Sequence, residues 1–260
     1  MRTRLIIVVF FLISIQCQHN PSSKGGVIAT NAWTAAYALA AGIDSVTVLA
    51  PYEMVHPSEY EMRPGDIARI ERAELIIHAG YEVMIEQIKT GLALPDEKML
   101  AINTSYNYEE IVQSVLQIAE KRQSEDIARE NLEEIKQVLD YGKEVIRKKG
   151  LDTIPVLVHF FQQSFAKETG FNSAGVFGPS PPEPRQILSL TRTGAKLIID
   201  NAHNPSGGAL RETIENAGYV RLLNFPGLYG TRTLEDVIKY NVEQLTALEI
   251  CNRRSPTNAR

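Results

Sequence analysis

Short apolar segments alternate with segments of helical spacing in the first part of the chain. Strand-length apolar runs occupy residues 26–30, 46–49, 75–77 and 99–102. Helical patterns lie between them, at 33–41, 67–73 and 83–89. Strands that alternate with helices form parallel sheets covered by helices. Residues 25–108 are therefore predicted to form an N-terminal α/β lobe.

The same alternation returns in the C-terminal part of the chain. Apolar runs with the length of strands occur at 156–158, 173–176, 197–199 and 220–223. Helical patterns follow them at 160–169, 183–193, 209–217 and 234–248. We expect a C-terminal α/β lobe over 151–250, followed by a polar tail at 251–260. Two such lobes create a cleft at the carboxyl ends of their strands, where open α/β sheets bind ligands.

A long charged segment, residues 109–150, lies between the two lobes. Apolar residues recur in it with helical spacing, as at Ile111, Val115 and Ile118, and a polar stretch at 121–126 interrupts the pattern. The spacing predicts a helix that links the lobes. An exposed helical hairpin is the alternative that periodicity leaves open.

The first 24 residues have the pattern of a targeting segment. Arg2 and Arg4 precede an apolar run at 5–15, which is short for a membrane span, and Cys17 follows it. We expect a lipoprotein-type signal and tether, with Cys17 as the lipidated residue and membrane anchor. An ordinary cleaved signal and an uncleaved anchor are the alternatives. Each places the protein outside the cytoplasm, in the periplasm or at the cell surface.

Composition narrows the function classes. The formal net charge is −4 and the pI is near 5.8, so the chain lacks the basic character typical of nucleic-acid binding. The sequence contains no nucleophile elbow and no metalloprotease helix motif, so we do not expect an enzyme. A monomer is the default expectation.

Three of the five histidines lie in predicted loops or at strand ends: His56, His159 and His203. Imidazole is a common ligand of zinc, and manganese accepts it together with carboxylates. Loops from both lobes meet at the cleft, so we expect these three residues to share a divalent metal. Glu59 and Asp200 are further candidate ligands.

Three segments in order resemble one known family. They are residues 55–82, with His56, Tyr60 and the words RPGD and AELIIHAG, then VLVHFF at 156–161, and KLIIDNAHNP at 196–205. This pattern is similar to that of the bacterial zinc and manganese ABC-transporter solute-binding proteins, cluster A-I. The resemblance implies two Rossmann-like lobes joined by a long backbone helix. It also implies a Zn²⁺ or Mn²⁺ cargo, zinc before manganese, that is delivered to an ABC permease.

The family's usual four ligands are only partly present. His159 matches the third position, but Ser58 stands at the first, residues 103–106 contain no imidazole, and Asn224 replaces the final aspartate. A remodelled metal site is therefore one interpretation.

Two alternatives stay open beside the remodelled metal site. In one, the same fold binds a non-metal solute or a metal chelate through the residues Tyr60, Asn103, Tyr106, Asn224 and Tyr229. In the other, the protein is a surface lipoprotein that acts as an adhesin and has lost metal transport.

Overall fold

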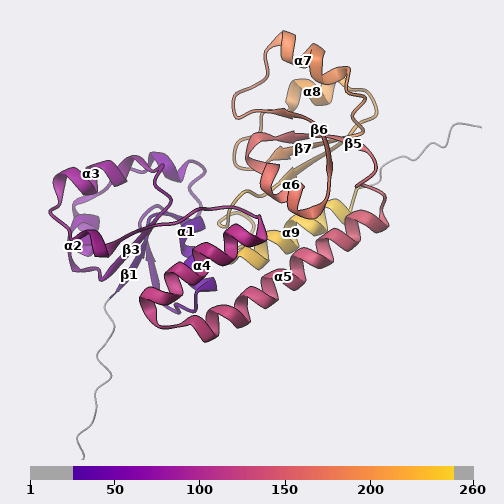
Figure 1. Cartoon of the computed structure of the whole chain (residues 1–260). Helices are drawn as coiled ribbons and strands as arrows, with labels where there is room; N and C mark the ends of the chain where they lie inside the picture. Colours follow the sequence, from indigo (N-terminus) through magenta and orange to yellow (C-terminus); the bar gives the residue numbers. More distant parts are fainter. Residues whose placement is uncertain (1–25, 249–260) are drawn as a thin grey trace, which may run out of the picture.

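The computed structural model describes residues 26–248. The predicted signal with Cys17 and the polar tail lie outside these residues. Two lobes, each built on its own sheet, are connected by a layer of helices (Figure 1). No helix within residues 26–248 has both the length and the apolar character that crossing a membrane requires.

The N-terminal lobe contains a four-stranded parallel sheet in the order β2-β1-β3-β4. Its strands are β1 (Val27–Ala29), β2 (Val46–Val48), β3 (Leu75–His78) and β4 (Met99–Ala101). Its helices are α1 (Ala32–Ala40), α2 (Pro64–Arg72) and α3 (Val83–Gly91). The central strands β1 and β3 are buried along their whole length, as expected for a parallel sheet covered on both faces.

The C-terminal lobe repeats this arrangement in the order β6-β5-β7-β8, again all parallel. Its strands are β5 (Pro155–His159), β6 (Asn172–Phe177), β7 (Leu197–Asn201) and β8 (Gly218–Leu222). Its helices are α6 (Gln163–Thr169), α7 (Pro184–Thr191) and α8 (Gly208–Thr213). The predicted two-lobed α/β architecture is confirmed.

The linking segment consists of two helices, α4 (Tyr108–Arg122) and α5 (Glu125–Lys148). The two helices are separated within the polar stretch at 121–126. There Gln123 adopts a left-handed φ of 55° and ends α4. The 24-residue α5 is the long backbone helix, and it packs against α4, α6 and the C-terminal α9 (Leu234–Thr246). Both α4 and α9 also contact α1, so this layer touches both lobes (Figure 1).

One apolar core runs through both lobes. It includes Trp33 and Tyr37 from α1, Ile135 from α5, and Phe165 from α6. Polar contacts reinforce the junction at Glu168 of α6, whose carboxylate accepts from Tyr108 N at 3.2 Å and from Lys143 Nζ at 2.8 Å. Because the lobes share a core, we expect them to move little relative to each other.

We predict that Ile135→Ala destabilises both lobes together. Ile135 is fully buried in the shared core, and such truncations cost about 2–5 kcal/mol. Urea denaturation should show a single transition at lower urea. Ile127→Ala, on the same helix but half exposed, should cost less. Two separate transitions in Ile135→Ala would show that the lobes unfold independently.

Candidate functional site

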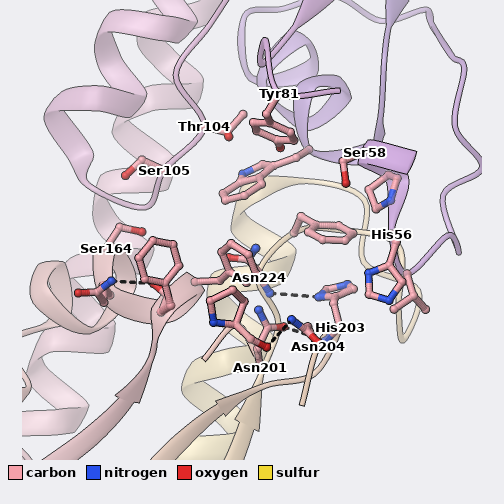
Figure 2. A pocket seen from close by; sticks show the side chains of 18 of the residues that line it. His56, Ser58, Tyr81, Thr104, Ser105, Ser164, Asn201, His203, Asn204 and Asn224 are labelled. Atoms are coloured by element: carbon pink, nitrogen blue, oxygen red, sulfur yellow. Dashed lines mark hydrogen bonds between the residues drawn. The ribbon is translucent and has the colours of Figure 1, made fainter. Parts of the chain in front are cut away.

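A cavity of about 800 Å³ lies between the lobes. Residues that follow each of the eight strands line it. In each sheet the second strand lies on one side of the first strand, and the third and fourth strands lie on the other side. The chain therefore reverses direction across the sheet between β1 and β3, and again between β5 and β7. Each of these places is a topological switch point. Side chains from both lobes converge on this space (Figure 2). The predicted cleft is thus present where open parallel sheets bind ligands.

The N-terminal lobe lines the cavity with polar and aromatic residues from the segments that follow its four strands. They are Trp33 after β1, His56, Ser58 and Glu59 after β2, Tyr81 after β3, and Thr104 and Ser105 after β4. Asn31 caps α1 by accepting from Trp33 N at 2.9 Å and Thr34 N at 3.0 Å. This cap begins the helix directly at the cavity and sets the position of Trp33.

The buried carboxylate of Glu82 holds two of these loops together. Its Oε1 accepts from Thr30 Oγ1 at 2.5 Å, Asn31 Nδ2 at 2.9 Å and Ala79 N at 3.0 Å. Its Oε2 accepts from Gly80 N at 2.8 Å. These bonds connect the loop after β1 with the loop after β3, which carries Tyr81.

The C-terminal lobe adds amides, aromatic rings and one buried imidazole. Its lining residues are Phe160, Phe161, Gln163 and Ser164 after β5, Pro179 after β6, Asn201 at the end of β7 with His203 and Asn204 after it, and Asn224 and Phe225 after β8. The loop after β8 is held by Asn241 of α9, which accepts from Leu223 N at 2.7 Å and donates to Leu223 O at 3.0 Å.

Asp200 organises the loop that carries His203. Its Oδ1 accepts from Asn201 N at 2.8 Å and Ser206 N at 3.2 Å. Its Oδ2 accepts from Gly207 N at 2.8 Å and Tyr219 Oη at 2.6 Å. The carboxylate is fully buried and is not among the lining residues. In this arrangement Asp200 supports the loop, as Glu82 does in the other lobe.

His203 lines the cavity, and one of its ring nitrogens has no hydrogen-bond partner among the described residues. Its ring stacks on Phe225 with centroids 3.7 Å apart, and Nδ1 accepts from Asn224 N at 3.4 Å (Figure 2). Its Nε2 is buried without a hydrogen-bond partner in the described part of the chain. Burial, and then the charge of His56, lower the pKa of His203 to about 4. The imidazole is therefore neutral near pH 7.

His56 reaches the same cavity from the opposite lobe (Figure 2). A close contact between the lobes fixes the start of its loop, because a Cβ on Gly227 would lie 1.9 Å from the Tyr52 carbonyl oxygen. Arg232 also lies over the Tyr52 ring, 4.8 Å from its centroid. Only glycine at position 227 permits this approach.

His159 ends β5 but is not among the lining residues. Its Nδ1 accepts from Phe161 N at 3.1 Å, so the neutral ring carries its proton on Nε2. That nitrogen faces Gly178, because a Cβ there would lie 2.5 Å from it. Burial lowers the pKa of His159, and the charge of Asp200 partly opposes this effect.

His56, His203 and Glu59 all line the same cavity. Within residues 26–248, no three or more His, Cys, Asp or Glu side chains are grouped so that they could hold a metal ion. The metal site stays a prediction, and a site that includes His159 requires its ring to turn. Asp200 would have to release its loop to take part.

The aromatic walls are the feature that sequence reasoning missed. Trp33 stacks on Tyr106 and Phe225, with centroids 5.9 and 6.1 Å apart, and so connects the two lobes. Phe160 and Phe161 follow β5 directly. Their position at the carboxyl end of a predicted strand could have indicated that they line the cavity. Of the residues proposed for an organic ligand, Asn224 lines the cavity. Tyr60, Asn103, Tyr106 and Tyr229 do not.

Solved structures with a similar fold include a metal-binding protein and a laminin-binding protein. The Cd-bound periplasmic metal binding protein from Candidatus Liberibacter asiaticus matches with a TM-score of 0.62 and 18% identity, over 86% of this chain and 98% of that chain. Its Mn-bound form gives the same four values. The laminin-binding protein Lbp of Streptococcus pyogenes matches with a TM-score of 0.65 and 16% identity, over 85% and 97%. No protein-family model and no curated protein matches the sequence. At these identities the likeness establishes the two-lobed fold.

We predict that His203 makes stability depend on pH. Burial lowers its pKa from 6.5 to about 4, so between these values the unfolded chain binds a proton that the folded protein does not. The free energy of unfolding is therefore unaffected by this group above pH 6.5, and it decreases as the pH falls from 6.5 toward 4. About 2 kcal/mol should be lost between pH 8 and pH 5. Urea unfolding of His203→Gln should show a correspondingly smaller pH dependence, and curves parallel to wild type would contradict this assignment.

We predict that Asp200→Asn destabilises the protein by about 2–4 kcal/mol, because an amide leaves buried donors without an acceptor. The measurement is urea denaturation at pH 7. The control is Asp140→Asn on the surface of α5, where the ion pair with Lys136 contributes under about 1 kcal/mol. Equal losses in the two variants would refute the role given to Asp200.

Proposed function

We propose that the protein is an extracytoplasmic solute-binding protein of an ABC importer, with a divalent metal ion as its cargo. One observation carries this proposal: His56 and His203 reach a single cavity from opposite lobes. They are close enough for the charge of His56 to lower the pKa of His203. The likeness in fold to proteins described as Cd-bound and Mn-bound supports the same class of cargo.

The state of His203 suits metal binding. A metal ligand must be a neutral imidazole, and a pKa of about 4 keeps this one neutral near pH 7. A metal on Nε2 leaves the ring proton on Nδ1, so the contact from Asn224 N is lost. At 3.4 Å that contact is at the long end of hydrogen bonds, and its loss costs little.

Zinc is the cargo that we expect before manganese. Two imidazoles favour zinc, whereas manganese prefers carboxylate, carbonyl and water oxygens. Glu59 lines the same cavity and is the carboxylate that we expect to join either ion. His159 joins the ligands only if its ring leaves the hydrogen bond with Phe161 N.

We further propose that the loaded protein delivers its ion to a membrane permease. The predicted signal and lipidated Cys17 support a location outside the cytoplasm, anchored beside such a permease. Because the shared core limits movement of the lobes, recognition of the loaded state would depend on loops at the cavity rather than on wide closure. A monomer is sufficient for this function.

The test is titration of zinc and manganese into metal-free protein at pH 7.5. Calorimetry and the fluorescence of Trp33, the sole tryptophan, should report zinc binding at one site. His56→Ala and His203→Ala should each weaken zinc by more than about tenfold, since even residues that only support metal ligands affect affinity by 10–100-fold.

The control is His78→Gln, because His78 is buried in β3 and does not line the cavity. It should bind zinc like the wild type. His159→Ala separates two arrangements: retained affinity fits the two-histidine site, and lost affinity fits a site that His159 completes by turning. If neither zinc nor manganese produces heat or a fluorescence change, the metal proposal is wrong.

A further inference from the structure

The interlobe cavity is much larger than a metal ion needs. Its volume of about 800 Å³ lies within the range of about 300–1,000 Å³ that is typical of pockets for small organic molecules. Two imidazoles also leave zinc short of the four ligands that it usually takes. Both the unused space and the unused coordination positions point to a second component.

Three residues that line the cavity each have a buried polar atom without a hydrogen-bond partner among the residues that the structure describes. The atoms are Trp33 Nε1, His203 Nε2 and Asn224 Oδ1, and each side chain is at least nine-tenths buried. Buried polar atoms are seldom left unpaired in folded proteins. The indole N–H can only donate, so Trp33 requires an acceptor, such as an oxygen of a bound molecule.

Aromatic rings form much of the wall around these atoms. Trp33 stacks on Phe225, which stacks on His203. Phe160 and Phe161 also line the cavity and are 50% and 39% exposed, although both are apolar. Rings of this kind bind planar molecules by offset or edge-to-face stacking.

The charged groups on the described wall are carboxylates alone. Glu59 and Glu110 line the cavity, and none of its lining residues is lysine or arginine. A free organic anion would therefore meet no opposite charge. A molecule that offers an oxygen to Trp33 fits this wall when its own charge is neutralised by a bound cation.

From these features we infer that the metal is bound as a complex with a small chelator that has a planar aromatic ring and an oxygen ligand. The complex as a whole is neutral or positive. This inference rests on the proposed function, because His56 and His203 supply the protein's ligands. Their nitrogens replace water molecules on the metal, the chelator ring stacks on the aromatic wall, and its oxygen accepts from Trp33 Nε1.

Two zinc complexes serve as probes in calorimetry on the full-length protein. Equimolar zinc–picolinate carries an aromatic ring and a carboxylate, whereas zinc–bipyridine carries rings but no oxygen. Both are compared with zinc alone and with each chelator free of metal. We expect zinc–picolinate to bind at least about tenfold tighter than zinc alone, with zinc and picolinate retained together in equal amounts after dialysis.

Trp33→Phe separates the roles of the indole N–H and the ring, because phenylalanine keeps a ring and removes the donor. It should weaken zinc–picolinate by about tenfold, the upper range for one hydrogen bond, and leave zinc–bipyridine and zinc alone unchanged. Tyr141→Phe is the control: it removes one polar group from an aromatic residue that is 58% exposed on α5. It should change none of the affinities.

The outcomes distinguish this inference from the proposed function. If zinc alone binds as tightly as both complexes, the inferred chelator is wrong, but the proposed metal cargo is still supported. If the metal-free chelators bind as tightly as their zinc complexes, or if no zinc species binds, the proposed metal cargo fails together with the inference. An equal loss of all ligands in Trp33→Phe would assign Trp33 a structural role and overturn its assigned contact.

Discussion

Two buried carboxylates hold the loops that make the cavity. Glu82 follows the central strand β3 and joins the loops that carry Trp33 and Tyr81. Asp200 lies in the equivalent strand of the other lobe, β7, and accepts four donors around the loop of His203. A buried charge is tolerated only when such partners surround it. Each lobe thus fixes its cavity loops by the same means, and neither carboxylate lines the cavity.

The shared core determines how the cavity can respond to a solute. Trp33 of α1 stacks on Phe225 of the other lobe, and the layer of α4, α5 and α9 packs against both lobes. Rigid packing resists gradual deformation. The shared core therefore limits changes in the shape of the cavity, and under the proposed function the side chains that line it determine selectivity. Such preorganisation also reduces the entropy lost when a solute is ordered.

The sequence predicted the architecture well because strand burial and helix periodicity are local signals. The apolar runs at β3 and β7 and the interruption near Gln123 are visible without a structure. The direction of a ring is not a local property. His159 lies at the expected strand end, but its orientation depends on Phe161 N and on the backbone at Gly178. The convergence of Trp33, Tyr81 and Phe225 also requires both lobes, and so no single segment could indicate it.

Buried polar atoms without partners lower the stability of the empty protein, and the same atoms can stabilise a complex with a solute. The fold keeps His203 buried and neutral near pH 7. Among residues 26–248, neither its Nε2 nor the Trp33 indole N–H has a hydrogen-bond partner. A solute that satisfies both atoms binds the folded chain and not the unfolded one, so it stabilises the fold by mass action. Because the unpaired atoms come from opposite lobes, a solute that spans the cavity gains more than one that meets either lobe alone. Under the proposed function, the cavity would therefore select a solute by its size as well as by its chemistry.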